Sequence, residues 1–236
     1  MKSTSLPFLL ALGLLVQACT PASSPADYVN PFVGTDFNGH TFPGATLPFG
    51  MVQLSPDTRI DGSWEGCSGY HYSDSVLYGF SHTHLSGTGV SDYGDILLMP
   101  QVGEPSFEQS EYAAGFSHAD EKAEPGYYEV ALSSGIKAEL TATTRAGFHR
   151  YAFPKSTNSI ILDLTHRDPL TEGHIQILDE HTVAVGRRSN AWARDQHAYA
   201  YIVFDHAFDP VFNDDSTKVI FRFGAVVSVM AKVGIS

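Results

Sequence analysis

Short runs of alternating apolar and polar residues follow one another through the second half of the chain. Alternation with a period of two is typical of a β-strand that buries one face. The pattern predicts nine strands, at residues 127–132, 137–143, 147–153, 159–164, 174–178, 182–185, 199–204, 218–223 and 226–233. No segment shows the pattern of a long amphipathic helix. Short strands separated by turns predict an all-β fold, an antiparallel β-sandwich.

Two kinds of connection support this prediction. The tripeptide 179–181 is short enough to join the strands on either side of it as a β-hairpin. Gly135 and Gly224 stand where turns are expected, between consecutive predicted strands.

The first half of the chain differs in composition and in hydrophobic pattern. From Asp27 to about Pro100 it is rich in Gly, Pro, His, Asp and Ser, and clean alternation is scarce. We expect loops to dominate this region, and loops often carry functional sites. Hydroxyls, imidazoles, carboxylates and aromatic rings are concentrated there. That combination suits a sugar, which needs planar polar groups for its hydroxyls and a flat ring for its apolar face.

The N-terminus has the pattern of an export signal. Lys2 precedes a short apolar run, residues 9–16, which is too short to span a bilayer. The run ends in a sequence that resembles the bacterial lipobox, with an alanine before Cys19. We therefore predict a lipoprotein signal peptide at 1–18, lipidation of Cys19, and a tether at 19–27. The predicted location is the bacterial cell envelope, lipid-anchored at the outer membrane, periplasm or cell surface. The alternative is an ordinary secretory peptide with a chance cysteine.

Charge and cysteine content narrow the possibilities further. The formal net charge is −12, so the chain has no electrostatic reason to bind nucleic acid. There are two cysteines, Cys19 and Cys67. If Cys19 carries lipid, Cys67 has no intramolecular partner, and the fold must be held by its core without a disulfide.

Several long strings resemble, in the same order, the N-terminal signature of glycoside hydrolase family 92. They extend over essentially all of the chain after the tether. The strings lie at 30–35 (NPFVGT), 39–59 (GHTFPGATLPFGMVQLSPDTR), 67–74 (CSGYHYSD), 79–89 (GFSHTHLSGTG), 92–95 (DYGD), 143–151 (TTRAGFHRY) and 189–197 (SNAWARDQH).

The resemblance implies an architecture and an activity. In that family an N-terminal β-sandwich, similar to the galactose-mutarotase-like supersandwiches, packs on a C-terminal (α/α)6 toroid. Members are calcium-dependent, exo-acting α-mannosidases that invert the anomeric centre, with N-glycans and mannans as the expected class of substrate. Inversion uses an acid and a base roughly 6.5–9.5 Å apart. Both carboxylates and the Ca2+ ligands belong to the family's toroid.

This sequence stops before such a toroid would begin. We therefore interpret residues 28–236 as the N-terminal domain, truncated at its C-terminal end. We expect no catalytic residue and no metal ligand in this chain, and no mannosidase activity from it alone. Its expected partners are a mannose-containing glycan, the missing C-terminal domain and a membrane reached through the lipid anchor.

The resemblance also implies that the loop 57–67 reaches over the mouth of the toroid and contributes to the substrate pocket. Trp64 is then a stacking platform for a sugar ring, or alternatively anchors its loop to the core. Asp57 and Arg59 either form a fork that holds sugar hydroxyls or make a plain salt bridge across a turn.

Two histidines complete the predicted substrate-binding set. His82 and His84 are spaced by one residue, which would place both imidazoles on one face of a strand. This spacing also suits a metal site that Asp92 or Asp95 could complete, but calcium prefers oxygen donors. Support of the substrate loop and structural hydrogen bonding are the competing roles. His40 is expected to be a satisfied polar residue in a packed loop.

Other residues leave alternatives open. Cys67 as a nucleophile would need a nearby base and a lowered pKa. Trp192 and the pairs 187–188 and 194–195 lie between strands, either at an interface with the toroid or on a solvated surface. Two other functions compete with the mannosidase domain: a stand-alone carbohydrate-binding module, and an unrelated metal-dependent enzyme that uses His82 and His84.

Overall fold

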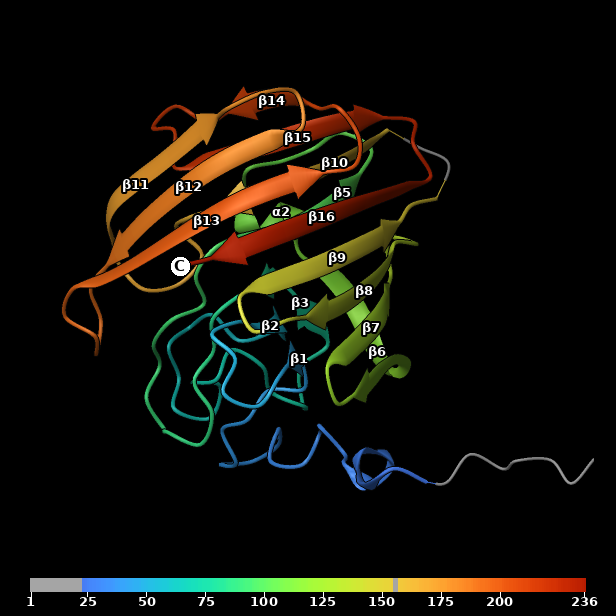
Figure 1. Cartoon of the computed structure of the whole chain (residues 1–236), viewed down its shortest axis with the longest axis vertical. Coiled ribbons are helices and arrows are strands. Elements are labelled where there is room, and N and C mark those ends of the chain that lie inside the picture. The colour runs from blue at the N-terminus through green and yellow to red at the C-terminus, as the bar shows by residue number, and fades with distance from the viewer. Residues whose placement is uncertain (1–22, 155–156) are drawn as a thin grey trace, which may run out of the picture.

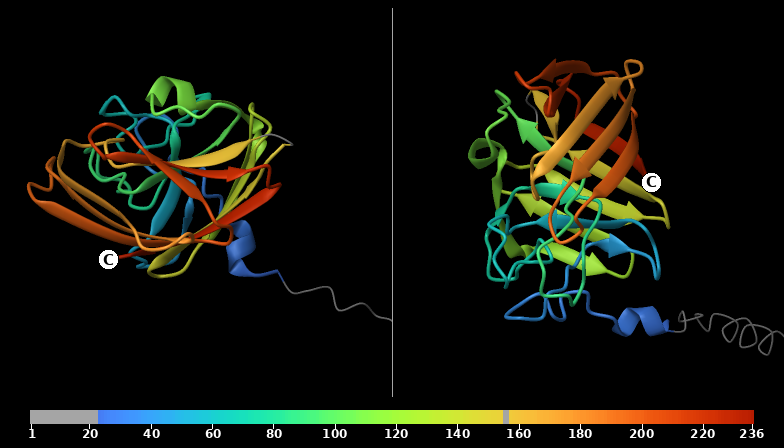
Figure 2. Two further views of the ribbon diagram at one scale, coloured as in Figure 1. Left: turned by 90° about the horizontal axis from the view of Figure 1, so that it is seen from above. Right: turned by 90° about the vertical axis from the view of Figure 1, so that its left-hand side faces the viewer.

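The computed structural model describes residues 23–154 and 157–236 of the chain. It shows two antiparallel sheets that pack face to face (Figure 1). The nine-stranded sheet curves around the smaller, seven-stranded one (Figure 2). This is the predicted all-β sandwich. The predicted signal peptide, 1–18, and the predicted lipidation site, Cys19, lie outside the described residues.

The larger sheet contains most of the C-terminal half of the chain. Its strands, in spatial order, are β11 (Leu170–Ile177), β12 (Thr182–Ser189), β13 (Gln196–Phe204), β16 (Ser228–Ile235), β9 (Ala146–Ala152), β8 (Lys137–Ala142), β7 (Tyr127–Leu132), β6 (Ala114–Glu124) and β3 (Val76–Leu77).

The smaller sheet combines strands from both halves of the chain. Its order is β1 (Ala45–Thr46), β2 (Gln53–Asp57), β4 (Gly79–Ser81), β5 (Leu97–Val102), β10 (Asn158–Asp163), β15 (Lys218–Gly224) and β14 (Asp209–Phe212). Two short helical turns accompany the sheets, η1 (Pro25–Tyr28) and α2 (Gln109–Tyr112). Within the described residues, no helix is long and apolar enough to cross a membrane.

Strand β13 shows how alternation in the sequence becomes a layer of the core. Ala198, Ala200, Ile202 and Phe204 point into the sandwich and are buried, while the intervening residues are exposed. The ring of Phe204 lies 5.0 Å from that of Phe221 in β15, measured between ring centroids, so the contact bridges the two sheets. Side chains on the inner faces of the two sheets thus form one continuous apolar core.

All nine strands predicted from alternation are present, with ends that differ by up to four residues. The predicted hairpin at 179–181 is confirmed, because β11 and β12 pair on either side of it. Gly135 and Gly224 adopt positive φ angles of 83° and 69°, as turn glycines do.

The expectation that loops dominate from Asp27 to about Pro100 is confirmed, although short strands that alternation did not predict also lie in that region. Strands β2, β4 and β5 lie there and form neighbouring strands of the smaller sheet. Strand β5 is almost entirely buried on both faces, so its residues show no alternation of apolar and polar positions. Prolines within β2 and β5, Pro56 and Pro100, further obscure the pattern.

We expect Phe204→Ala to lower the free energy of unfolding by about 3–5 kcal/mol, because it opens a cavity between the sheets. The matched control is Tyr201→Ala in the same strand. Its side chain is 53% exposed, so the change should stay within about 0.5 kcal/mol. Urea unfolding curves of both variants provide the measurement. Equal losses would contradict the assignment of the two faces of β13.

Candidate functional site

Five loop segments meet at one end of the sandwich, below the strands in Figure 1. We call them the loop end: residues 34–41, 58–69, 83–95, 164–168 and 190–195. The amide of Gly87 donates to the carbonyl of His40 at 2.6 Å. The guanidinium of Arg167 donates to the carbonyl of Cys67 at 3.0 Å. The amide of Ala193 donates to Asp92 at 3.0 Å. Each contact joins two segments that are distant in the sequence.

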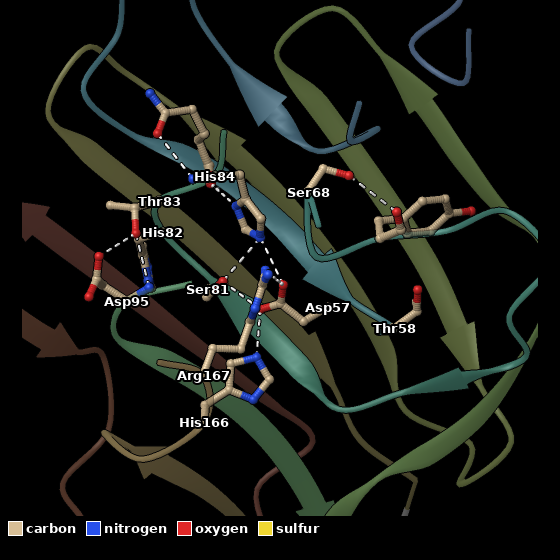
Figure 3. Close-up of polar contacts among 12 residues, drawn as sticks. Asp57, Thr58, Ser68, Ser81, His82, Thr83, His84, Asp95, His166 and Arg167 are labelled. Carbon is tan, nitrogen blue, oxygen red and sulfur yellow. Dashed lines mark hydrogen bonds and ion pairs between the residues drawn. The ribbon is translucent and has the colours of Figure 1, made fainter. Parts of the chain in front are cut away.

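Asp57 lies at the centre of a buried polar cluster beneath these loops (Figure 3). Its side chain, at the end of β2, has no exposed surface. One carboxylate oxygen lies 2.9 Å from Nε2 of His84. The other accepts a hydrogen bond from Ser81 at 2.5 Å and faces Nε2 of His166 at 3.0 Å. Burial by itself would raise the pKa of Asp57, but the facing His84 and His166 outweigh it and hold the pKa below its usual range.

The partners of Asp57 are themselves fixed by second hydrogen bonds. Nδ1 of His84 lies 2.7 Å from the carbonyl oxygen of Gln53 and can donate to it. Nδ1 of His166 accepts from the side-chain amide of Gln109 at 3.2 Å, which leaves Nε2 of His166 to donate to Asp57. The cluster therefore connects β2, the loop after β4, the loop after β10 and helix α2.

A second buried carboxylate, Asp95, joins the loop after β4 to the larger sheet. Thr83 donates to one of its oxygens at 2.7 Å (Figure 3). The guanidinium of Arg187 in β12 donates to the other, and its Nε donates to the carbonyl of Leu164 at 2.9 Å. Arg187 is only 3% exposed. The prediction that it lies at an interface or on a solvated surface was wrong, because its charge is neutralised inside the protein by Asp95.

The neighbouring groups predicted with Arg187 do lie at the surface. Arg188 is partly exposed and donates to Asp195 at 2.6 Å. Trp192 is 70% exposed. Whether this surface contacts another domain stays a prediction.

His82 and His84 do not form a shared metal site. Nδ1 of His82 lies 2.6 Å from the carbonyl oxygen of Ile96, and its Nε2 lies 2.9 Å from Nε2 of His149 in β9. Since His82 donates through Nδ1, its Nε2 must accept from His149. His149 in turn accepts from the hydroxyl of Tyr151 through Nδ1, at 2.8 Å. The result is a directional chain of hydrogen bonds that joins the two sheets.

Burial acts on both members of this imidazole pair. It lowers the pKa of His82 to about 4, and it lowers the pKa of His149 well below its ordinary value. Both rings are therefore neutral near pH 7. Across the described residues, no group of three or more His, Cys, Asp and Glu side chains is placed to hold a metal ion. The hypothesis of a metal enzyme built on His82 and His84 therefore has no structural support.

Trp64 lies on the surface of the loop end with a fixed orientation. Its side chain is 54% exposed, so it does not anchor its loop in the core. The indole meets the imidazole of His40 edge to face, with ring centroids 4.3 Å apart and planes at 84°. On another side Gly89 approaches so closely that a Cβ there would lie 2.9 Å from the indole nitrogen. The indole is thus both exposed and held, as a stacking platform must be.

Arg59 lies apart from Asp57, so the predicted pair between these two residues is not formed. Its guanidinium makes two hydrogen bonds to Asp74, at 3.1 and 2.6 Å. These bonds raise the pKa of Arg59. The pair borders a surface hollow of about 360 Å³ that is also lined by Thr58, Asp61 and Tyr78. Contact of Asp57, Arg59, His82, His84 and Trp64 with a sugar stays a prediction.

Cys67 is buried and is not in a disulfide. Burial raises the pKa of its thiol, which keeps the thiol protonated and disfavours a nucleophilic role.

Sequence reasoning missed His166 and Arg167. They follow strand β10, whose residues are all buried, and they bring an imidazole and a guanidinium to the loop end. A polar sequence directly after a buried strand is the signal that could have indicated them. Their contact with Asp57 joins residues more than 100 positions apart and has no local signature.

Together the fold and the loop end define an all-β sandwich domain that gathers its polar and aromatic loops at one end. The N-terminal domain of glycosyl hydrolase family 92 matches residues 28–236. The chain belongs to this family.

Known proteins resemble the chain in sequence and in structure. A family GH92 α-mannosidase from Bacteroides thetaiotaomicron, solved in complex with mannoimidazole, is 33% identical with a TM-score of 0.81; the match covers 89% of this chain and 32% of that one. The structure of an inverting GH92 mannosidase from Bacteroides thetaiotaomicron VPI-5482 is 28% identical with a TM-score of 0.76. That match covers 91% of this chain and 32% of the mannosidase. An uncharacterized secreted glycosidase of Arthroderma benhamiae is 35% identical over 195 residues, 76% of this chain and 25% of that protein. The chain therefore spans about a quarter to a third of the length of these relatives.

The neutral imidazole of His82 predicts acid sensitivity. Its folded pKa of about 4 lies below the unfolded value of about 6.5, so the unfolded state binds more protons between these values. The stabilising contribution is complete above pH 6.5 and is lost as the pH falls toward 4. Between pH 7 and pH 5 wild type should lose about 2 kcal/mol more free energy of unfolding than His82→Gln. Urea unfolding at the two pH values measures the difference, and parallel behaviour of the two proteins would contradict a neutral His82.

The buried pair of Arg187 and Asp95 predicts a large difference between adjacent arginines. Arg187→Met should lower the free energy of unfolding by about 3–5 kcal/mol, because it leaves the Asp95 carboxylate buried without its partner. Arg188→Met, the matched control, should cost about 1 kcal/mol or less, since its ion pair is at the surface. Thermal and urea unfolding of the two variants test this. A loss for Arg188→Met as large as that for Arg187→Met would refute the assignment.

Proposed function

We propose that this chain is the substrate-pocket-contributing domain of an exo-acting, inverting α-mannosidase that hydrolyses mannosidic bonds in N-glycans or mannans. Family membership supports a glycoside hydrolase. Two structural neighbours support mannose as the sugar, since one was solved in complex with mannoimidazole and the other is an inverting mannosidase. The chain matches only about a third of those proteins, so we assign the proposed activity to a larger protein that would include this domain.

The single observation that carries the proposal is Trp64, an exposed aromatic ring held at the loop end by His40 and Gly89. The apolar face of a pyranose stacks on such a ring, and the polar groups of the surrounding loops are suited to its hydroxyls. We place the loop end against the mouth of the catalytic domain.

Two buried carboxylates beneath the loop end, Asp57 and Asp95, are occupied by structural contacts. Inversion needs a protonated acid and a base with a water between them, roughly 6.5–9.5 Å apart. Asp57 is engaged by His84, His166 and Ser81, and Asp95 by Arg187 and Thr83. Neither is free to transfer a proton to a sugar or to activate water. We therefore expect the acid, the base and the Ca2+ ligands in the rest of the enzyme, and no turnover by this chain alone.

The likeness to a secreted glycosidase is in keeping with export of this protein. We propose that it is held in the bacterial cell envelope by a lipid on Cys19, where it meets external glycans. The second candidate function is a stand-alone carbohydrate-binding module. The same exposed Trp64 favours it, since a stacking platform can bind a sugar without cleaving it.

The test compares this chain with the longest product that its gene encodes. Both are assayed on α-linked mannobiose with and without a calcium chelator. We expect release of mannose by the longer product, loss of that release with the chelator, and none from this chain. Turnover by this chain would refute the assignment of the catalytic groups. Sugar binding without turnover by either protein would favour the binding module.

In the active product, Trp64→Ala should raise KM roughly 10-fold, because it removes the surface on which the sugar ring stacks. The control is Trp192→Ala, the other exposed tryptophan, which should leave KM within about twofold of wild type. Steady-state kinetics on α-linked mannobiose provide the measurement. If the Trp192 variant is impaired and the Trp64 variant is not, the platform has been assigned to the wrong residue.

A further inference from the structure

Asp168 has a buried carboxylate oxygen, Oδ2, with no hydrogen-bond partner among the described residues. Several polar atoms at the loop end share this property. Nε2 of His40 is one of them, so His40 is not the satisfied residue that the sequence predicted. Asp168 is the more severe case, because an ionised oxygen loses more solvation free energy on burial than a neutral nitrogen does. A buried charge in this position requires a counter-charge or a proton.

The group that faces this carboxylate is a second carboxylate. Asp92 is 1% exposed and lies within hydrogen-bond reach of the Asp168 side chain. Its Oδ2 accepts from the backbone amide of Ala193 at 3.0 Å. We call Asp92 and Asp168 the carboxyl pair. Two ionised carboxylates repel each other, and neither can donate a hydrogen bond. A proton on either of them removes both problems, since the protonated carboxyl then donates to its neighbour.

The two nearby guanidinium groups are engaged by other acceptors. Arg187 in β12 donates to Asp95, and its Nη2 donates to the backbone carbonyl of Asp168 at 3.1 Å. Arg167 donates to the carbonyl of Cys67 at 3.0 Å. Within the described part of the chain, neither carboxylate of the pair forms a salt bridge with an arginine, lysine or histidine. The geometry therefore leaves a proton as the group that stabilises the pair.

The carboxyl pair lies where three of the five segments of the loop end meet. Asp92 belongs to segment 83–95 and Asp168 to segment 164–168. Ala193, whose amide donates to Asp92, belongs to segment 190–195. The amide of Asn190 in that segment donates to the carbonyl of Pro169 at 3.2 Å, which brings it to the same place. The charge on the pair therefore acts on the contact between all three segments.

We propose that the carboxyl pair is a pH-sensitive latch of the loop end, closed when Asp92 and Asp168 share a proton and opened by its loss. Without the proton, the two charges repel and the three segments separate more readily. Segment 83–95 also carries Gly89, which packs on Trp64. Acid therefore orders the surface that we propose for the sugar contact. The latch itself does not depend on that contact.

The sign of the pH effect follows from the position of the pair. Burial, and then the hydrogen bond with Asp92, raise the pKa of Asp168 from its ordinary value of 3.8 to about 6. Arg167 on its own segment and Arg187 on β12 act in the opposite direction without cancelling this rise. The closed state thus binds more protons than the open state between these values. The contribution of the latch is complete below about pH 4 and is lost as the pH rises through 6.

Two measurements on this chain test the latch, both with EDTA present so that no divalent cation replaces the proton. NMR of the side-chain carboxyl carbon of Asp168 across the pH range reports when the pair loses its proton. Hydrogen exchange of the Ala193 amide, corrected for the intrinsic exchange rate at each pH, reports how often the latch opens.

Three variants accompany wild type. Asp168→Asn and Asp92→Asn each replace the shared proton by a permanent amide donor of the same shape. Asparagine tolerates the left-handed backbone at position 168, where φ is 50°, as well as aspartate does. The matched control is Asp195→Asn, which changes an exposed carboxylate in segment 190–195 that pairs with Arg188.

In wild type the Asp168 signal should titrate near pH 6. Protection of the Ala193 amide should fall about 10-fold between pH 5 and pH 7.5, the ratio that this rise in pKa supplies when opening restores the ordinary value. Asp168→Asn and Asp92→Asn should change less than about twofold over the same range, and Asp195→Asn should keep the full response. The direction is diagnostic, because acid lowers global stability through His82 but raises protection here.

Three results would overturn the inference. A titration of Asp168 near pH 4 would show that the pair does not hold a proton. A wild-type response that persists in both Asp168→Asn and Asp92→Asn would assign the pH dependence to another group. Protection of Ala193 that does not change with pH would show that the proton does not hold the segments together. The titration needs wild type alone, so it decides the proposal even where a variant fails to fold.

Discussion

The buried carboxylate of Asp57 is the constraint around which the loop end is organised. A charge without solvent contact is stable only when polar groups surround it. Here those groups come from the end of β4, from the loop after it and from the segment after β10, and they hold the carboxylate from several sides. The desolvation of Asp57 therefore requires segments that are distant in the sequence to meet in one arrangement. If any of them moved away, a buried charge would lose its partner.

The same principle recurs on the other side of the loop end. Asp95 links the loop after β4 to Arg187 in the larger sheet, and the pair of His82 and His149 links the two sheets between their inner faces. These polar contacts give the loops a fixed position on the sandwich without a disulfide, since Cys67 is not in one. The apolar core supplies most of the stabilisation, while the polar clusters determine which arrangement the loops adopt.

This rigidity has a functional consequence for the surface above it. An aromatic platform binds a sugar well when it is ordered before the ligand arrives. Trp64 is ordered by its contacts with His40 and Gly89 and remains exposed. The structure thus separates two tasks. Buried carboxylates and imidazoles hold the loops, and the exposed indole is left free for the sugar contact that we propose. The relatives that the chain matches are about three to four times as long as the chain itself.

The sequence by itself determined the fold class and seven of the nine strands that form the larger sheet. Alternation in strands such as β13 predicts one buried and one exposed face, because the side-chain period of a strand is fixed by local geometry. The motif strings identified the family in the same way, as linear patterns.

Only the tertiary structure decided the roles of single polar residues. It placed β5 at the centre of a sheet, separated Arg59 from Asp57, buried Arg187 and left His40 unpaired. The physical reason is that burial and hydrogen-bond partnership are set by residues far apart in the sequence, and Asp57 and His166 carry no local signal of the contact between them.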